Sequence, residues 1–99
     1  GLSARQSAEK EAFEEAGIVG RIADQPLGHY LYRKSDKKGG RLCQVEVYPL
    51  LVQRMVRNWP EQPVRSRKWM ACRTAANAVW EEKLGDLILE LGERLRREA

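Results

Sequence analysis

The first pattern along the chain is a stretch of small apolar and acidic residues, rich in alanine and glutamate. Ser3 and Gln6 are spaced as in a capping box, in which each side chain satisfies a backbone N–H group of a helix's first turn. Gly17 stands where a left-handed residue would stop the helix, because glycine adopts a positive φ without strain. The pattern therefore predicts a short helix over residues 4–16.

After this helix the apolar positions become β-branched and aromatic, which is typical of strands. Strands are predicted over three stretches, residues 18–22, 27–33 and 41–53. A polar turn cluster over residues 35–40 separates the last two, so we expect them to form a hairpin. Pro49 cannot donate to a strand ladder, and the long third strand should carry a bulge or lie at a sheet edge there.

The last third of the chain changes to a helical period. A further short strand carrying Trp69 is predicted over residues 67–71, with the large aromatic packed against the sheet. From Arg73 onward the apolar spacing predicts two helices that meet near Leu84 and Gly85. Helices combined with a mostly antiparallel or mixed sheet define the α/β (α+β) class, and we expect one domain over residues 1–99.

Composition and charge narrow the class of protein. A chain of 99 residues with 42% hydrophobic residues can enclose one core, and its net charge of +4 favours polyanionic partners only weakly. Cys43 and Cys72 lie far apart with no neighbouring histidine, which argues against disulfides and zinc and for a reducing, cytoplasmic location. No signal sequence, membrane span or nucleic-acid motif is recognisable, so we expect neither a membrane nor a nucleic-acid partner. The pattern leaves the oligomeric state open.

The chemistry that the sequence suggests lies on the first helix. Glu11, Glu14 and Glu15 are spaced i, i+3 and i+4, which puts three carboxylates within an arc of about 100°. Their mutual repulsion would be relieved by a divalent cation, whose hard character suits carboxylate oxygen. The alternative is a solvated acidic face without a bound ion.

The order of residue types from Lys10 to Ile18, KEAFEEAGI, resembles the Nudix signature R-E-U-x-E-E-x-G-U, with Lys10 in place of the arginine. The resemblance implies a Nudix-type mixed β-sheet sandwiched between helices and a Mg²⁺ or Mn²⁺ cofactor. It also implies that Glu11 and Glu15 bind the metal, while Glu14 binds metal or acts as the catalytic general base. A metal-activated water would then cleave a phosphoanhydride in a nucleoside diphosphate derivative, dinucleoside polyphosphate or diphosphoinositol polyphosphate.

The resemblance extends over residues 27–70, which look like the diphosphoinositol polyphosphate and diadenosine polyphosphate hydrolase branch of the family. In this chain Lys68 takes the place of that branch's glutamate, and Leu2 takes the place of an earlier glutamate of the signature. The signature's first glycine would fall before residue 1. We therefore expect a Nudix domain that is truncated at its amino terminus and lacks its first strand or strands.

Basic residues around the predicted hairpin turn offer a second clue. Arg33, Lys34 and Arg41 are candidates for binding the phosphates of the substrate, together with Lys37 and Lys38 in the turn itself. The alternative is a solvated turn whose charges discourage strand pairing with other chains.

Three functions are consistent with these patterns. The first, which the ordered signature favours, is a Nudix pyrophosphohydrolase acting on a phosphorylated small molecule. The second is a non-catalytic module that keeps the Nudix fold and binds a phosphorylated ligand, as the departures at Lys10, Leu2 and Lys68 would permit. The third is an unrelated α+β interaction domain with an acidic helix.

Overall fold

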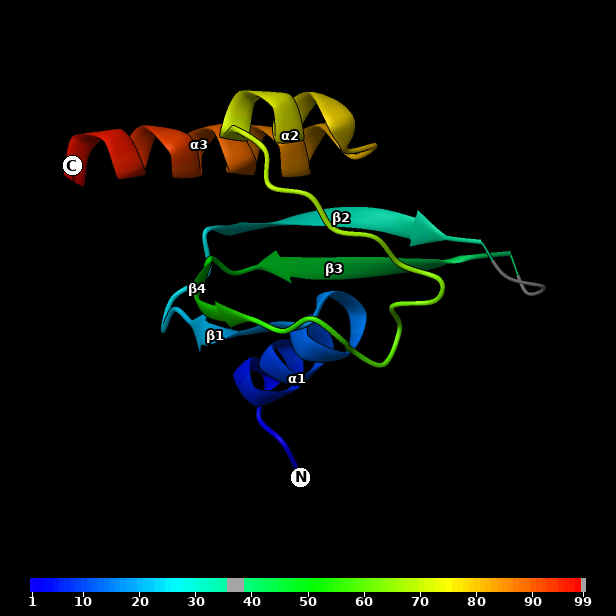
Figure 1. Cartoon of the computed structure of the whole chain (residues 1–99). Coiled ribbons are helices and arrows are strands. Elements are labelled where there is room, and N and C mark those ends of the chain that lie inside the picture. Colours follow the sequence, from blue (N-terminus) through cyan, green and yellow to red (C-terminus); the bar gives the residue numbers. More distant parts are fainter. Residues whose placement is uncertain (36–38, 99) are drawn as a thin grey trace. The chain divides into compact units, whose positions relative to one another are not determined.

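The computed structural model describes residues 1–35 and 39–98. Its elements, in chain order, are α1 (Ala4–Ala16), β1 (Ile18–Ile22), β2 (Gly28–Lys34), β3 (Arg41–Val47), β4 (Leu50–Met55), α2 (Cys72–Ala78) and α3 (Glu82–Glu98) (Figure 1). They belong to two compact units: unit 1 holds residues 1–25 and 49–69, and unit 2 holds residues 26–48 and 70–99. Helices combined with strands confirm the α/β (α+β) class. In the described part, however, the strands form two separate antiparallel pairs, β1–β4 and β2–β3, instead of one mixed sheet.

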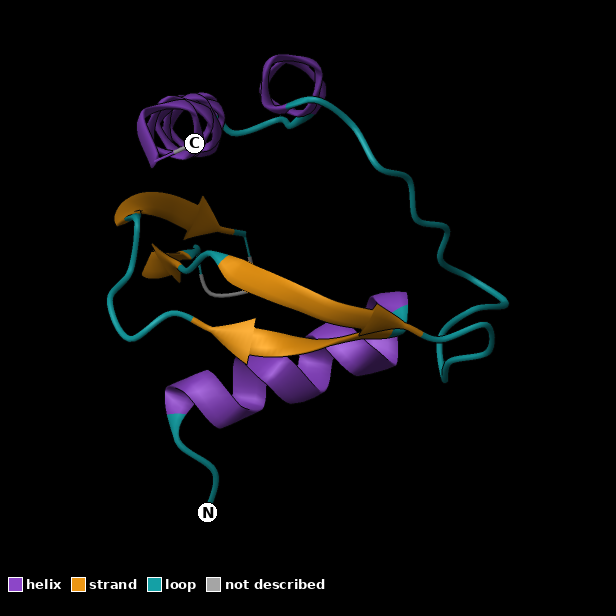
Figure 2. Cartoon of the chain, turned by 60° about the vertical axis from the view of Figure 1, so that its left-hand side comes forward, coloured by secondary structure: helices purple, strands orange, loops and turns teal. Residues whose placement is uncertain are grey.

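Unit 1 consists of α1 lying against the β1–β4 pair (Figure 2). The helix begins and ends where the sequence predicts, because Ser3 and Gln6 form the complete capping box and Gly17 adopts a left-handed φ of 65°. The carboxylate of Glu9 accepts the backbone N–H of Ile22 at 2.8 Å, which ties the middle of the helix to β1. Ile22, with an exposed fraction of 5%, is the centre of this unit's small core.

The predicted single strand over residues 41–53 is wrong. β3 ends at Val47 and pairs with β2, whereas β4 begins at Leu50 and pairs with β1, so the two halves of the predicted strand belong to different sheets. The break falls at Pro49, which has no N–H to donate to a ladder and whose carbonyl accepts the N–H of Ala23 at 3.0 Å. Pro49 therefore separates β3 from β4, and β4 pairs with β1 instead of continuing the β2–β3 pair.

Unit 2 contains the predicted hairpin and the two carboxy-terminal helices. β2 and β3 pair in register over their full lengths, from Gly28 opposite Val47 to Lys34 opposite Arg41. α3 packs against β2 through Leu87, which has an exposed fraction of 7%. A β-carbon on Gly28 would lie 2.6 Å from a methyl group of Leu87, so this glycine permits the close packing.

The helix junction predicted near Leu84 and Gly85 is wrong. α2 ends at Ala78, and α3 begins at Glu82 after an extended residue at Val79. Gly85 lies inside α3 and is buried against α2, where a β-carbon would meet the carbonyl oxygen of Ala76 at 2.9 Å. The glycine therefore lets two helices approach each other instead of ending one of them.

The strand predicted over residues 67–71 is also wrong. This stretch forms neither a helix nor a strand, and the described residues give it no ladder partner. Trp69 has an exposed fraction of 68%, so it does not pack in a core; its indole N–H points to the sulfur of Met55 at 3.1 Å. No described helix combines the length and the apolar character that crossing a membrane requires.

Candidate functional site

The three carboxylates singled out in the sequence all lie on α1. Glu11 is exposed, whereas Glu14 and Glu15 are half-buried in the last turn of the helix. Glu9, two positions before Glu11, turns instead to β1, where it holds the N–H of Ile22. Helical geometry thus divides the acidic residues into one that anchors the helix and three that share its other side.

One of these carboxylates already has a cationic partner. The guanidinium of Arg65 lies 3.1 Å from Glu15 and also 3.1 Å from Glu61, so a single arginine bridges two acidic side chains. Within the described residues Glu11 and Glu14 form no ion pair. Glu14 therefore carries the half-buried carboxylate that has no competing cation.

The end of α1 is held by a segment more than forty residues further along the chain. A helix leaves its last carbonyl groups without intrahelical donors. Here the carbonyl of Glu14 accepts the N–H of Glu61 at 2.9 Å, and that of Glu15 accepts the indole N–H of Trp59 at 3.0 Å. The carbonyls of Ala16 and Gly17 accept the guanidinium of Arg67, at 2.8 and 3.2 Å.

The side chains of Arg67 and Trp59 also contact each other. The guanidinium carbon lies 4.2 Å from the centroid of the Trp59 ring, a cation–π distance, and the same side chain donates to the carbonyl of Val56 at 2.7 Å. A β-carbon on Gly17 would lie 2.8 Å from both the guanidinium and the indole. Gly17 is therefore required for two reasons, its positive φ and the room that it leaves for these two side chains.

The charges at this helix end oppose the usual preference. The carboxyl end of a helix carries partial negative charge, which disfavours acidic residues there. Glu14 and Glu15 nevertheless lie in the last turn, and α1 has no basic residue of its own in that turn. The compensating positive charge comes from Arg65 and Arg67, both beyond β4 in the chain.

The donor chemistry of α1 fits a hard divalent cation, although the side chains are not gathered into a site. No three acidic, histidine or cysteine side chains among the described residues lie close enough together to hold a metal ion. Three carboxylates on one side of a helix are nevertheless the oxygen donors that Mg²⁺ and Mn²⁺ prefer. Binding would require Glu11, Glu14 and Glu15 to change rotamer, and Glu15 to exchange Arg65 for the metal.

The candidate phosphate-binding residues lie in unit 2. Lys34 and Arg41 are directly opposite each other at the turn end of the hairpin, with Arg33 opposite Leu42, and all three cations are exposed. None of the three forms an ion pair with another described residue. Lys37 and Lys38, the other cations of the predicted cluster, lie outside the described residues. Like charges directly across a strand pair repel, which favours a bound anion.

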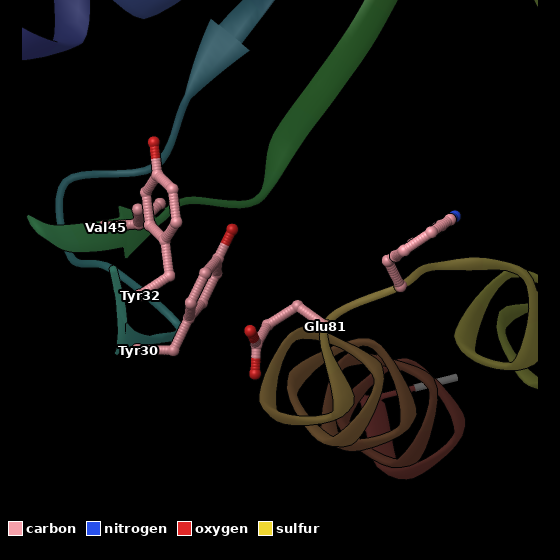
Figure 3. Close-up of a pocket in the computed structure, with 5 residues that line it drawn as sticks. Tyr30, Tyr32, Val45 and Glu81 are labelled. Carbon is pink, nitrogen blue, oxygen red and sulfur yellow. The ribbon is translucent and has the colours of Figure 1, made fainter. Parts of the chain in front are cut away.

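A shallow pocket of about 430 Å³ also lies in unit 2. Its lining consists of Tyr30, Tyr32, Val45, Trp80 and Glu81. Tyr30 and Tyr32 project from the same side of β2, as alternate strand residues do, and Glu81 lies across from them, just before α3 (Figure 3). Aromatic rings and a carboxylate, with no lysine or arginine in the lining, make this pocket unsuited to phosphate. Trp80 is fully exposed, so it does not close the pocket.

The fold and site together define an α+β protein with an acidic helix whose last turn is fixed by a distant tryptophan and arginine. Comparison with known proteins identifies the group. Nudix hydrolase 16, mitochondrial, of Arabidopsis thaliana is 31% identical over 90 residues, covering 87% of this chain and 49% of the relative. Nudix hydrolases 18 and 17, mitochondrial, of the same plant are 32% and 33% identical over 91 residues, covering 89% of this chain and 50% and 48% of themselves.

The chain therefore belongs to the Nudix hydrolase superfamily, as the residues of α1 suggested. It spans about half the length of the curated relatives it matches. No protein-family model and no solved structure matches it. Sequence reasoning found the acidic residues but missed Trp59 and Arg67 as partners of the helix end. One signal in the sequence was that both residues lie in the stretch 27–70, which resembles the diphosphoinositol polyphosphate and diadenosine polyphosphate hydrolase branch.

Proposed function

We propose that this protein is a Mg²⁺- or Mn²⁺-dependent pyrophosphohydrolase that cleaves a phosphoanhydride bond in a phosphorylated small molecule. The observation that carries the proposal is the acidic end of α1, where two half-buried glutamates are kept in place against an unfavourable helix dipole. Membership of the Nudix superfamily supports the same reading. The substrate classes are nucleoside diphosphate derivatives, dinucleoside polyphosphates and diphosphoinositol polyphosphates.

In this proposal Glu11 and Glu15 hold the metal ion, and Glu14 holds metal or takes a proton from the attacking water. When bound, the metal neutralises the diphosphate and activates that water. Glu14 suits the general base because its half-buried carboxylate pairs with no cation among the described residues. Glu15 must first release Arg65, which lies 3.1 Å away.

The test is turnover by the full-length protein with a panel of dinucleoside polyphosphates, nucleotide sugars and diphosphoinositols, with and without Mg²⁺. We expect a phosphate-containing product only when the metal is present. Glu14→Gln should lower kcat by about 10² to 10⁴, the range of a general base. Glu98→Gln is the matched control, because Glu98 also lies in the last turn of a helix but far from α1 in the chain. Metal-independent turnover, or equal loss in both variants, would refute the proposal.

A second candidate is a non-catalytic module that binds a phosphorylated ligand through Arg33, Lys34 and Arg41. The observation in its favour is the cross-strand pair of cations at the end of the hairpin. Calorimetry with inorganic pyrophosphate distinguishes the two functions. Affinity that is lost in Lys34→Gln but unchanged by Mg²⁺ and by Glu15→Gln supports the binding module, whereas metal-dependent turnover supports the enzyme.

A cytoplasmic location is also part of the proposal, as a prediction from the two separated cysteines. Five of the matched relatives carry the word mitochondrial in their names, which describes those proteins. Fractionation of cells that express the tagged full-length protein would decide between the two compartments.

A further inference from the structure

We propose that Trp59 and Arg67 are positioning residues of the acidic helix: they fix the backbone of its last turn, so that the side chains of Glu14 and Glu15 can reach the metal ion from a fixed place. The inference rests on the proposed function and deepens it, because it assigns a role to residues outside the helix. The observation behind it is the set of hydrogen bonds that Trp59 and Arg67 donate to the carbonyls of Glu15, Ala16 and Gly17.

A helix end that lacks donors for its last carbonyls frays, and side chains on a frayed turn sample many directions. In α1 the last turn is the one that carries Glu14 and Glu15. The indole of Trp59 bonds to the backbone of Glu15 itself, at 3.0 Å. Any freedom at this carbonyl would therefore move a proposed metal ligand directly.

Trp59 and Arg67 act on the backbone and leave the carboxylates free. This distinguishes them from Arg65, which occupies the carboxylate of Glu15 and must leave when a metal binds. The guanidinium of Arg67 joins three carbonyls, those of Ala16, Gly17 and Val56, and it is stacked on Trp59. A planar, multidentate donor of this kind cannot be replaced by the single ammonium of lysine.

The test measures Mn²⁺ binding to the full-length protein by electron paramagnetic resonance, with the folded fraction of each variant measured by circular dichroism. Trp59→Phe keeps a ring for Arg67 to stack on but removes the indole N–H. Its matched control is Trp69→Phe, because Trp69 lies in the same unit and its indole N–H points to Met55 instead of α1. Arg67→Lys is compared in the same way with Arg57→Lys, because Arg57 is exposed and its side chain forms no ion pair with the described residues.

We expect Trp59→Phe and Arg67→Lys to weaken Mn²⁺ binding by about three- to thirtyfold while the protein stays folded, as the loss of one to two net hydrogen bonds implies. The two control variants should stay within about twofold of the wild type. Should Arg67→Lys fail to fold, Trp59→Phe alone decides the question.

A lower melting temperature without a change in Mn²⁺ affinity would show that Trp59 and Arg67 only stabilise the fold, and it would overturn the inference. The failure of the proposed function has a different signature. In that case the wild-type protein itself binds no Mn²⁺ at α1, and Glu14→Gln and Glu15→Gln leave its spectrum unchanged.

Discussion

Replacing Gly17 by alanine disturbs the end of α1 in two separable ways. The residue has a φ of 65°, in the left-handed region that an alanine side chain adopts only with strain. The added β-carbon would also lie 2.8 Å from the guanidinium of Arg67 and 2.8 Å from the ring of Trp59. Both neighbours would have to move, and Arg67 would then lose its hold on the helix carbonyls.

The size of the effect follows from these two terms. The left-handed conformation costs about 1–2 kcal/mol for a residue with a β-carbon. Displacing Arg67 from the carbonyls of Ala16 and Gly17 removes hydrogen bonds from a charged donor, with a net value of about 1.5–3 kcal/mol. Gly17→Ala should therefore lower the free energy of unfolding by about 2.5–5 kcal/mol.

Gly39 provides the control that isolates the second term. It has a φ of 96°, but a β-carbon there would meet no atom of the described residues within 4 Å. Gly39→Ala should lower the free energy of unfolding by only about 1–2 kcal/mol, the conformational term alone. Urea denaturation of both variants measures the difference. If Gly17→Ala is no more destabilising than Gly39→Ala, the contact between Gly17, Trp59 and Arg67 has no energetic weight.

Three further substitutions test the charges of the molecule. Arg65→Gln should change the free energy of unfolding by less than about 1 kcal/mol, because the ion pairs of Arg65 are half-exposed. It should also tighten Mn²⁺ binding measured by calorimetry, and weaker binding would contradict competition between Arg65 and the metal. Lys34→Glu places opposite charges across the β2–β3 pair, so it should stabilise the hairpin by about 0.2–1 kcal/mol in thermal unfolding while reducing pyrophosphate binding. Glu14→Gln should raise the free energy of unfolding by about 0.3–1 kcal/mol at low salt while lowering kcat by about 10² to 10⁴; a loss of stability would show that the helix dipole is not the governing term.

Local patterns predict the parts of the fold that local chemistry controls. The helix α1 ends where Ser3 and Gly17 indicate, because a capping box and a left-handed glycine act within a few residues. The hairpin of β2 and β3 also follows from alternation on either side of a polar turn. The prediction of a single strand over residues 41–53 was wrong because the alternation of apolar residues continues through Pro49. Periodicity does not say which sheet a strand joins.

The junction between α2 and α3 was misplaced for a related reason. Gly85 resembles a helix terminator in the sequence, but in the structure it is the position where α3 lies closest to Ala76 of α2. Glycine serves both purposes, and only the packing distinguishes them. The predicted strand around Trp69 failed because β-propensity describes a residue that fits a sheet surface, and no ladder partner is present among the residues that the structure describes.

The sequence likewise predicts some residues of the candidate site and misses others. Its carboxylates are readable in the sequence because they lie within five residues on one helix, whereas Trp59 and Arg67 lie 44 and 51 positions from the groups they hold. The sequence does contain a sign that a distant partner is needed. Two glutamates stand at the helix end that disfavours negative charge, with no basic residue in the last turn of the helix. Proteins tolerate such local conflicts mainly at functional sites, where other residues compensate for them. The glutamates of α1 oppose the helix dipole, and residues 59–67 hold the turn that carries them. Both features are what a site that needs clustered negative charge at a fixed place would require.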